Sequence, residues 1–133
     1  MIRLATKKDE GLIKQIHKES NKEIGSFNLF KCWEDYLQRK TPYVYYVIEE
    51  RAFMRYGFSK RLKCYTIKEI GVKKEYQGQG LAEQLFKKTK SPLYLTCNED
   101  NERGNRFYKK MGMRLKGKKP TKNKLKIMNI WVK

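Results

Sequence analysis

The 133-residue chain carries 32 lysine and arginine side chains against 14 aspartate and glutamate side chains, a formal net charge of +18 at pH 7. With 39% hydrophobic and 13% aromatic residues, the sequence is too apolar for a disordered chain, and its length suits one domain over residues 1–133. Its apolar runs are too short for a membrane span and residues 1–20 lack a secretory-signal pattern, so no membrane partner is expected.

Two helices are predicted in the N-terminal third of the chain. Thr6, followed three residues later by Asp9, resembles a capping box with aspartate in the glutamate position, and apolar residues at helical spacing follow. This pattern predicts a helix over residues 6–23, which Gly25 ends. A second helix is predicted over residues 28–40, and the proline that follows prevents its continuation.

Three strands are predicted next, over residues 43–49, 52–58 and 64–72. Aromatic and β-branched residues are dense in these runs, and short polar turns separate them. Such a rapid succession predicts an antiparallel meander.

The C-terminal half alternates helices with strands. After the Gln-Gly-Gln-Gly run, the pattern predicts a helix from Leu81, a strand over residues 93–97, a helix over 102–111, a loop over 117–124 and a strand over 126–132. A strand–helix–strand unit forms a right-handed crossover, so strands 65–72 and 93–97 are expected to be parallel. The order predicts an α+β (mixed α/β) fold, with a mostly antiparallel mixed sheet, a central parallel pair and helices on both faces.

Gly78 and Gly80 stand where the predicted strand gives way to a helix. Glycines leave backbone N–H groups unobstructed and accept a positive φ, so the run suits either a tight turn or an anion such as pyrophosphate at the helix N-terminus. Two other phosphate motifs do not match, because Glu83 replaces the third glycine of GxGxxG and Leu81-Ala82 replace Lys-Ser/Thr of the P-loop. From these residues alone, a turn and an anion site both stay open.

Residues 72–86 resemble motif A of the GNAT acetyltransferase superfamily, Gln/Arg-x-x-Gly-x-Gly/Ala. Three residues occupy its signature positions: Gln77, Gly80 and Ala82. Residues 101–113 are similar to a second signature of the family, with Gly104 in place of an alanine. The resemblance covers residues 64–113, and two signatures in the right order are more specific than either one. It implies a GNAT-like acyltransferase fold and an acetyl-CoA-dependent N-acetyltransferase.

The resemblance also implies where acetyl-CoA, as co-substrate, would lie: between the strands that end at Val72 and Cys97, with the pyrophosphate on the glycine run. The residues that it assigns to the donor are Ile70, Val72, Gln77, Gly78, Gln79, Gly80, Leu81, Ala82, Asn101, Gly104 and Tyr108. Tyr108 occupies the position whose hydroxyl, in many family members, protonates the departing CoA thiolate. The alternative for Tyr108 is an aromatic core residue beside Phe107. No metal is implied.

The general base is less well defined. Glu69 is the single carboxylate on the strand before the glycine run, but strict alternation puts it on the face opposite Lys68 and Ile70. These residues do not indicate which face meets the acceptor, so a base acting through water and an amine that arrives neutral both stay open. His17, the one histidine of the chain, is predicted to lie on the surface of the first helix.

The cysteines and the charge bear on compartment and partners. Cys32, Cys64 and Cys97 form no CxxC pair and no cluster with the histidine, which argues against disulfides and a zinc site and favours a reducing cytoplasm. Residues 109–133 carry ten basic side chains and no acidic one, an asymmetry that attracts polyanions such as nucleic acid. A solvated lysine surface is the alternative.

Three hypotheses for the function follow. The first is acetyl transfer from an acyl-CoA donor to a primary amine on a nucleic-acid-associated acceptor: aminoacyl-tRNA, a ribosomal protein or nucleic acid itself. The second is a base-modifying enzyme on the same fold, of the kind found in phage Mom-type proteins. The third is a non-catalytic basic module that binds nucleic acid. The sequence leaves the acceptor and the oligomeric state open.

Overall fold

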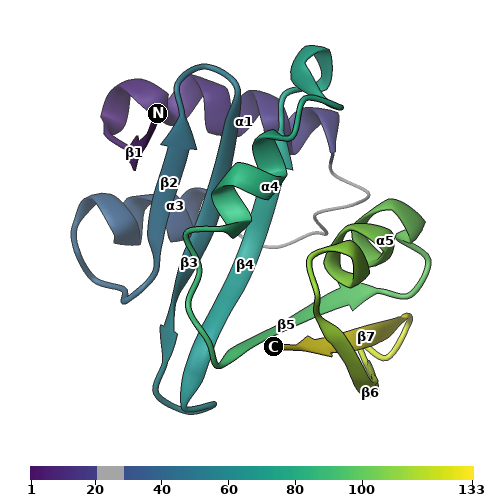
Figure 1. The fold of residues 1–133 in the computed structure, drawn as a ribbon. Coiled ribbons are helices and arrows are strands. Elements are labelled where there is room, and N and C mark those ends of the chain that lie inside the picture. Colours follow the sequence, from purple (N-terminus) through teal and green to yellow (C-terminus); the bar gives the residue numbers. More distant parts are fainter. Residues whose placement is uncertain (21–28) are drawn as a thin grey trace.

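The computed structural model describes residues 1–20 and 29–133, and its centre is a seven-stranded sheet in the order β1-β2-β3-β4-β5-β7-β6 (Figure 1). The strands are β1 (Ile2–Leu4), β2 (Val44–Ile48), β3 (Ala52–Ser59), β4 (Cys64–Val72), β5 (Leu93–Asn98), β6 (Arg114–Pro120) and β7 (Ile127–Val132). The helices are η1 (Lys7–Asp9), α1 (Glu10–Glu19), α3 (Leu29–Leu37), η2 (Lys74–Tyr76), α4 (Leu81–Phe86) and α5 (Glu102–Lys110). None of these helices is long and apolar enough to cross a membrane.

The sheet confirms the predicted fold class. Its strand pairs are antiparallel except for β4 and β5, which are parallel as the crossover rule predicts. Two short or polar strands were not predicted. The three residues of β1 are too few for a visible alternation. The predicted loop over residues 117–124 is wrong at its start, because β6 pairs with β7 as far as Pro120. This lysine-rich segment lies at the edge of the sheet, where exposed charged side chains are tolerated.

Helices cover both faces of the sheet. On one face, Ile13 and Ile16 of α1 and Trp33 of α3 pack against Tyr45 and Phe53. On the other face, α4 and α5 pack against a larger cluster that extends across β3, β4, β5 and β7. The predicted first helix is present as η1 and α1, while its predicted end at Gly25 and the predicted start of the second helix at Asn28 lie outside the described residues.

The start of the first helix is held by the predicted capping pattern. The Thr6 N–H donates to Asp9 Oδ2 at 2.8 Å, and Arg3 donates to both oxygens of Asp9 at 2.8 and 2.9 Å. Burial alone would raise the pKa of Asp9, but the hydrogen bonds from Arg3 and Thr6 outweigh it and keep this pKa below its ordinary value of 3.8. Because the pKa is depressed in the folded state, the ionised carboxylate stabilises the fold.

Replacing Asp9 by asparagine is therefore expected to destabilise the protein by about 1 kcal/mol or more at neutral pH. The contribution of the carboxylate is fully present above the unfolded-state pKa and is lost as the pH falls through the folded-state pKa. The difference between wild type and variant should consequently shrink as the pH is lowered from 6 toward 3. Urea unfolding at several pH values measures it, and a difference that stays constant over this range would contradict the explanation.

The two parallel strands separate soon after they meet. β4 and β5 pair at Tyr65–Leu93 and Thr66–Tyr94, although β4 continues to Val72 and β5 to Asn98. From Tyr94 onward β5 pairs with β7 on its other side, and Figure 1 shows it turning away from β4. Within the described part of the chain, the edge of β4 beyond Thr66 that faces β5 thus has no strand partner.

Candidate functional site

The turn from β4 into α4 depends on two glycines. Gly78 has φ 84° and Gly80 has φ 77°, in the left-handed region that other residues rarely adopt. A Cβ on Gly78 would meet nothing within 4 Å, and one on Gly80 would meet only Glu83 Oε2 at 3.8 Å. The glycines are thus required by the backbone angles rather than by crowding, and the space beside them is open.

Gln77 connects the end of β4 with α5 next to this turn. Its Nε2 donates to the carbonyl of Val72 at 3.2 Å, and its Oε1 accepts from Arg103 Nη1 at 2.6 Å. Arg103 was not among the predicted site residues, because a lone arginine in a helix has no distinctive sequence pattern. Only the packing of α5 shows that its guanidinium reaches the glycine turn, where it adds a positive charge.

The start of α5 packs closely on the end of β5. Asn101 Oδ1 accepts from the Gly104 N–H at 3.0 Å and caps the helix. A Cβ on Gly104 would lie 2.7 Å from Asn101 Nδ2 and 3.0 Å from Cys97 Sγ. Glycine is therefore required here for packing. This reason adds to the role in donor binding that the family resemblance implies for Gly104.

Tyr108 lies on the face of α5 that meets the sheet. Its side chain belongs to the core cluster of β5, and its ring packs edge-on against Phe107 at 5.4 Å between centroids. Burial, and secondarily the neighbouring Cys97, raises the pKa of Tyr108 above its ordinary value of 10.0. Burial also raises the pKa of Cys97 to about 11. Both groups consequently stay protonated at neutral pH, and the phenol is a hydrogen-bond donor.

Glu69 lies on the face of the sheet that α1 covers. Its side chain is fully buried, Oε1 accepts from Arg55 Nε at 2.6 Å, and Oε2 lies 2.8 Å from His17 Nε2. The prediction of a surface location for His17 is wrong. This side of α1 packs onto the sheet, and the imidazole makes an edge contact with Phe53 at 5.2 Å between ring centroids.

The alternation assumed for β4 fails at Lys68. The register between β3 and β4 shifts between Arg55 and Tyr56, which leaves Lys68 without a partner and forms a β-bulge. Lys68 Nζ lies 5.2 Å from the centroid of the Tyr43 ring, and Arg55 Cζ lies 5.9 Å from the same centroid. Lys68 and Glu69, expected on opposite faces, are therefore both neighbours of Arg55.

The remaining candidates for special chemistry form no further cluster. Cys32, Cys64 and Cys97 are free thiols. In residues 1–20 and 29–133, no three histidine, cysteine, aspartate or glutamate side chains gather to hold a metal ion. The arrangement thus offers an unpaired strand edge, a glycine turn with a nearby arginine, and a protonated phenol along one side of the sheet.

Known proteins share the fold of this chain. A family model described as an acetyltransferase (GNAT) domain matches residues 15–114. Among solved structures, Arabidopsis thaliana NAA60 in complex with acetyl-CoA superposes with a TM-score of 0.78 at 14% identity, covering 100% of this chain and 97% of that chain. A search of curated proteins gives no match.

Two bacterial structures are similar over nearly their full length. One is an acetyltransferase from Salmonella typhimurium that modifies the N-terminal serine of ribosomal protein L7/L12, with a TM-score of 0.76, 12% identity and coverage of 99% and 92%. The other is the ribosomal-protein-S18-alanine N-acetyltransferase of Escherichia coli, with a TM-score of 0.71, 17% identity and coverage of 99% and 91%. At these identities the similarity is one of fold.

Proposed function

Because this chain belongs to the GNAT acetyltransferase family and is an acetyl-CoA-dependent N-acetyltransferase, we propose that its acceptor is a primary amine of a polypeptide bound to nucleic acid, such as a ribosomal protein. The donor side of the reaction rests on the unpaired edge of β4 beyond Thr66, next to the glycine turn, and the observation that carries the proposed acceptor is the positive charge of the chain. The acceptor class is supported by the charge of +18 and by two similar folds whose substrates are ribosomal proteins.

The donor fits the separated strands by its own chemistry. Pantetheine contains amides, and an extended ligand with amides can pair with a free strand edge as an added strand would. The backbone of Ile70 and Val72 lies on that part of β4, past its last pair with β5. The proposed neighbours of the pantetheine also include Asn101 and Gly104, at the start of α5.

The phosphates of the donor would lie at the glycine turn, on the N–H groups of residues 77–82. Gly78 and Gly80 give the backbone its left-handed angles, and the space beside them is open. Arg103 adds a guanidinium within reach of Gln77, and such a group pairs well with phosphate oxygens. Arg103 therefore joins the proposed donor residues.

The reaction needs a proton at the departing sulfur and stabilisation of the carbonyl oxygen. The acceptor nitrogen attacks the thioester carbonyl, a new C–N bond forms, and the C–S bond breaks with the electron pair on sulfur. A backbone N–H near Val72 is the proposed donor to the carbonyl oxygen. The Tyr108 hydroxyl is the proposed hydrogen-bond donor to the sulfur as its negative charge develops, and the proton that the attacking nitrogen loses balances the proton that the thiolate takes up. Glu69 could take the proton of the amine only through His17 or water, because its carboxylate is fully buried.

Replacing Gly80 by alanine is expected to weaken acetyl-CoA binding by about tenfold. A residue with a Cβ pays about 1–2 kcal/mol in the left-handed region, so the turn relaxes and its N–H groups turn away from the phosphates. Gly112, at φ 87° after α5, provides a matched control with the same backbone strain outside the donor site. Calorimetry should show weaker binding for Gly80→Ala and unchanged binding for Gly112→Ala. Equal affinities for the two variants would exclude the glycine turn from the donor site.

The acceptor is tested by incubating the protein with ribosomal subunits, total tRNA and DNA in the presence of acetyl-labelled acetyl-CoA. The expected result is label on the amines of ribosomal or other nucleic-acid-bound proteins, located by mass spectrometry. Label confined to aminoacyl-tRNA or to DNA bases would overturn the proposed acceptor and leave the acetyltransferase activity standing. The Tyr108→Phe variant serves as the control for enzymatic labelling.

A further inference from the structure

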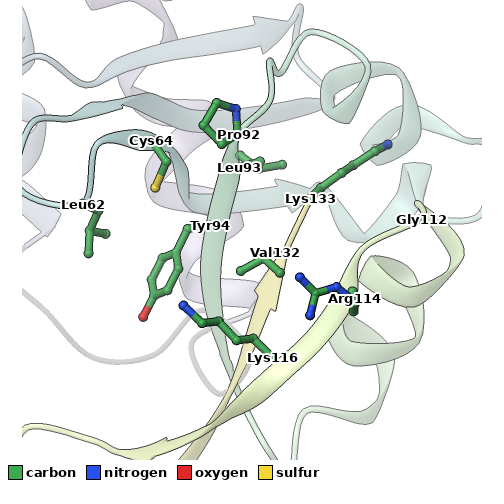
Figure 2. Close-up of a pocket in the computed structure, with 10 residues that line it drawn as sticks. All are labelled: Leu62, Cys64, Pro92, Leu93, Tyr94, Gly112, Arg114, Lys116, Val132 and Lys133. Atoms are coloured by element: carbon green, nitrogen blue, oxygen red, sulfur yellow. The ribbon is translucent and has the colours of Figure 1, made fainter.

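An open hollow of about 600 Å³ lies far from the glycine turn, where β5 begins and β7 ends (Figure 2). Its walls come from the turn between β3 and β4, from the start of β5 and from β6. Cys64 lines the hollow at the start of β4, whereas the glycine turn follows Val72 at its end. Eight residue steps of about 3.3 Å separate these two positions by about 26 Å. The hollow is thus distinct from the proposed donor site.

Two cationic side chains of the hollow are available for a ligand. Arg114 and Lys116 extend from β6, and Figure 2 shows them pointing toward Val132 and Tyr94. Neither pairs with a carboxylate of the described residues, and none of the described residues that line the hollow is acidic. Lys133 also lines the hollow, but its Nζ donates to the Met111 carbonyl at 3.0 Å.

The floor of the hollow is apolar and includes an aromatic ring. Leu62, Pro92 and Val132 contribute aliphatic surface, and the half-buried ring of Tyr94 stands beside them. Neither hydrophobic cluster of the described residues includes Tyr94 or Val132. Lys119 Nζ lies 5.8 Å from the centroid of the Tyr94 ring. An aromatic surface is thus left partly exposed among lysine and arginine side chains.

Positive charge continues from this hollow toward the bulge in β4. Desolvation lowers the pKa of Lys68, and the charges of Arg55, Arg61 and Lys119 lower it further. Arg61 precedes Leu62 of the hollow in the turn between β3 and β4, and Lys119 of β6 lies against the ring of Tyr94. A cationic surface therefore leads from the hollow along the face of the sheet where Lys68 lies.

We propose that this hollow binds a single-stranded segment of nucleic acid, with phosphates at Arg114 and Lys116 and an unpaired base against Tyr94. Lysine and arginine neutralise backbone phosphates, and aromatic rings stack on exposed bases. A duplex keeps its bases inside and would leave the ring and the apolar floor uncovered. A peptide of acidic residues alone, such as polyglutamate, would pair with the cations but has no flat apolar group for the ring. Acid-free residues 109–133, which include β6, extend the same positive field.

This site goes beyond the proposed acceptor and does not require it. The nucleic acid would hold the protein near an acceptor that is bound to the same strand. Binding to the hollow and binding of acetyl-CoA are measured separately, so either can fail without the other.

Fluorescence anisotropy with labelled ten-nucleotide oligouridylate and oligothymidylate tests the proposal. The double variant Arg114→Gln/Lys116→Gln should bind at least about tenfold more weakly at low salt. Its slope of log affinity against log salt should fall by about 1.4, the value for two phosphate contacts on a single strand. Tyr94→Leu should bind about tenfold more weakly, and Tyr94→Phe, which keeps the stacking surface, should bind as wild type.

The matched control removes the same charge elsewhere. Lys7→Gln/Lys18→Gln changes two exposed lysines at η1 and α1 and should alter affinity less than about threefold. The temperature of unfolding and the affinity for acetyl-CoA should be unchanged in all these variants. This result would establish that the fold is intact. Equal losses for the two double variants, or a ten-base-pair duplex or polyglutamate that binds as tightly as the oligonucleotides, would overturn the proposal. Preference for the uracil or the thymine strand identifies RNA or DNA as the ligand.

Discussion

Replacing Tyr108 by phenylalanine is expected to lower kcat for acetyl transfer by about 100-fold, with acetyl-CoA affinity unchanged within about threefold. The phenyl ring keeps the packing of α5 on β5, so only the hydroxyl is lost. Burial raises the pKa of this hydroxyl, which keeps it protonated throughout the neutral range. A weak acid of this kind donates a hydrogen bond as negative charge develops on the sulfur, an interaction stronger in the transition state than in the ground state.

Steady-state kinetics and calorimetry on the same preparations separate the two effects. Tyr45 provides the matched control, because it is a second buried tyrosine and its hydroxyl has no hydrogen-bond partner within the described residues. Tyr45→Phe should retain the wild-type kcat and should unfold at the same or a higher denaturant concentration. If Tyr108→Phe turned over as fast as wild type, the phenol would be a core residue only, which is the alternative that its sequence position leaves open.

Replacing Glu69 by glutamine is expected to lower the free energy of unfolding by about 3–5 kcal/mol. Glu69 is fully buried and lies between Arg55 Nε at 2.6 Å and His17 Nε2 at 2.8 Å. The side chain of Arg55 is only 12% exposed, so removing the negative charge of Glu69 costs the guanidinium an ion pair in a poorly solvated place. Chemical denaturation measures the loss.

Two further variants test this explanation. The exposed pair of Glu99 and Lys118 is the control, and Glu99→Gln should change the free energy of unfolding by less than about 1 kcal/mol. The double replacement Arg55→Met with Glu69→Leu removes both charges and should restore much of the stability that Glu69→Gln loses. A loss below about 1 kcal/mol for Glu69→Gln would show that the charge is solvated and the pair dispensable.

The same variant addresses the proton of the acceptor amine. If Glu69 takes that proton through His17, Glu69→Gln should lose activity beyond what its unfolded fraction explains. Activity measured at low temperature, where the variant is folded, makes the comparison. Activity in proportion to the folded fraction would assign Glu69 to stability alone and favour an amine that arrives neutral.

Local patterns predicted the elements that build the proposed donor site. The range of β4 agrees with its run of β-branched residues, and the turn after it lies where Gly78 and Gly80 interrupt the pattern. The predicted bond between Thr6 and Asp9 is present. These features depend on the backbone angles and side-chain periodicity of a few consecutive residues, which the sequence displays directly.

Two other features were predicted wrongly. One depends on a single extra residue that shifts the register of a strand, and the other depends on which face of a helix packs against the sheet. Strict alternation failed at Lys68, since a bulge adds one residue to β4 without an obvious signal in its sequence. The exposure of His17 was wrong because its face of α1 is decided by contact with Phe53 and Glu69. Residues 17 and 69 are 52 positions apart in the chain.

The sequence by itself therefore determined the family, the order of most elements and the glycine turn, because each depends on the pattern of a short stretch of consecutive residues. The tertiary structure decided which side chains meet across the sheet: Arg103 with Gln77, Glu69 with Arg55 and His17, and Lys119 of β6 with Tyr94. These contacts depend on strand register, helix face and burial. All three are fixed only when the whole core packs.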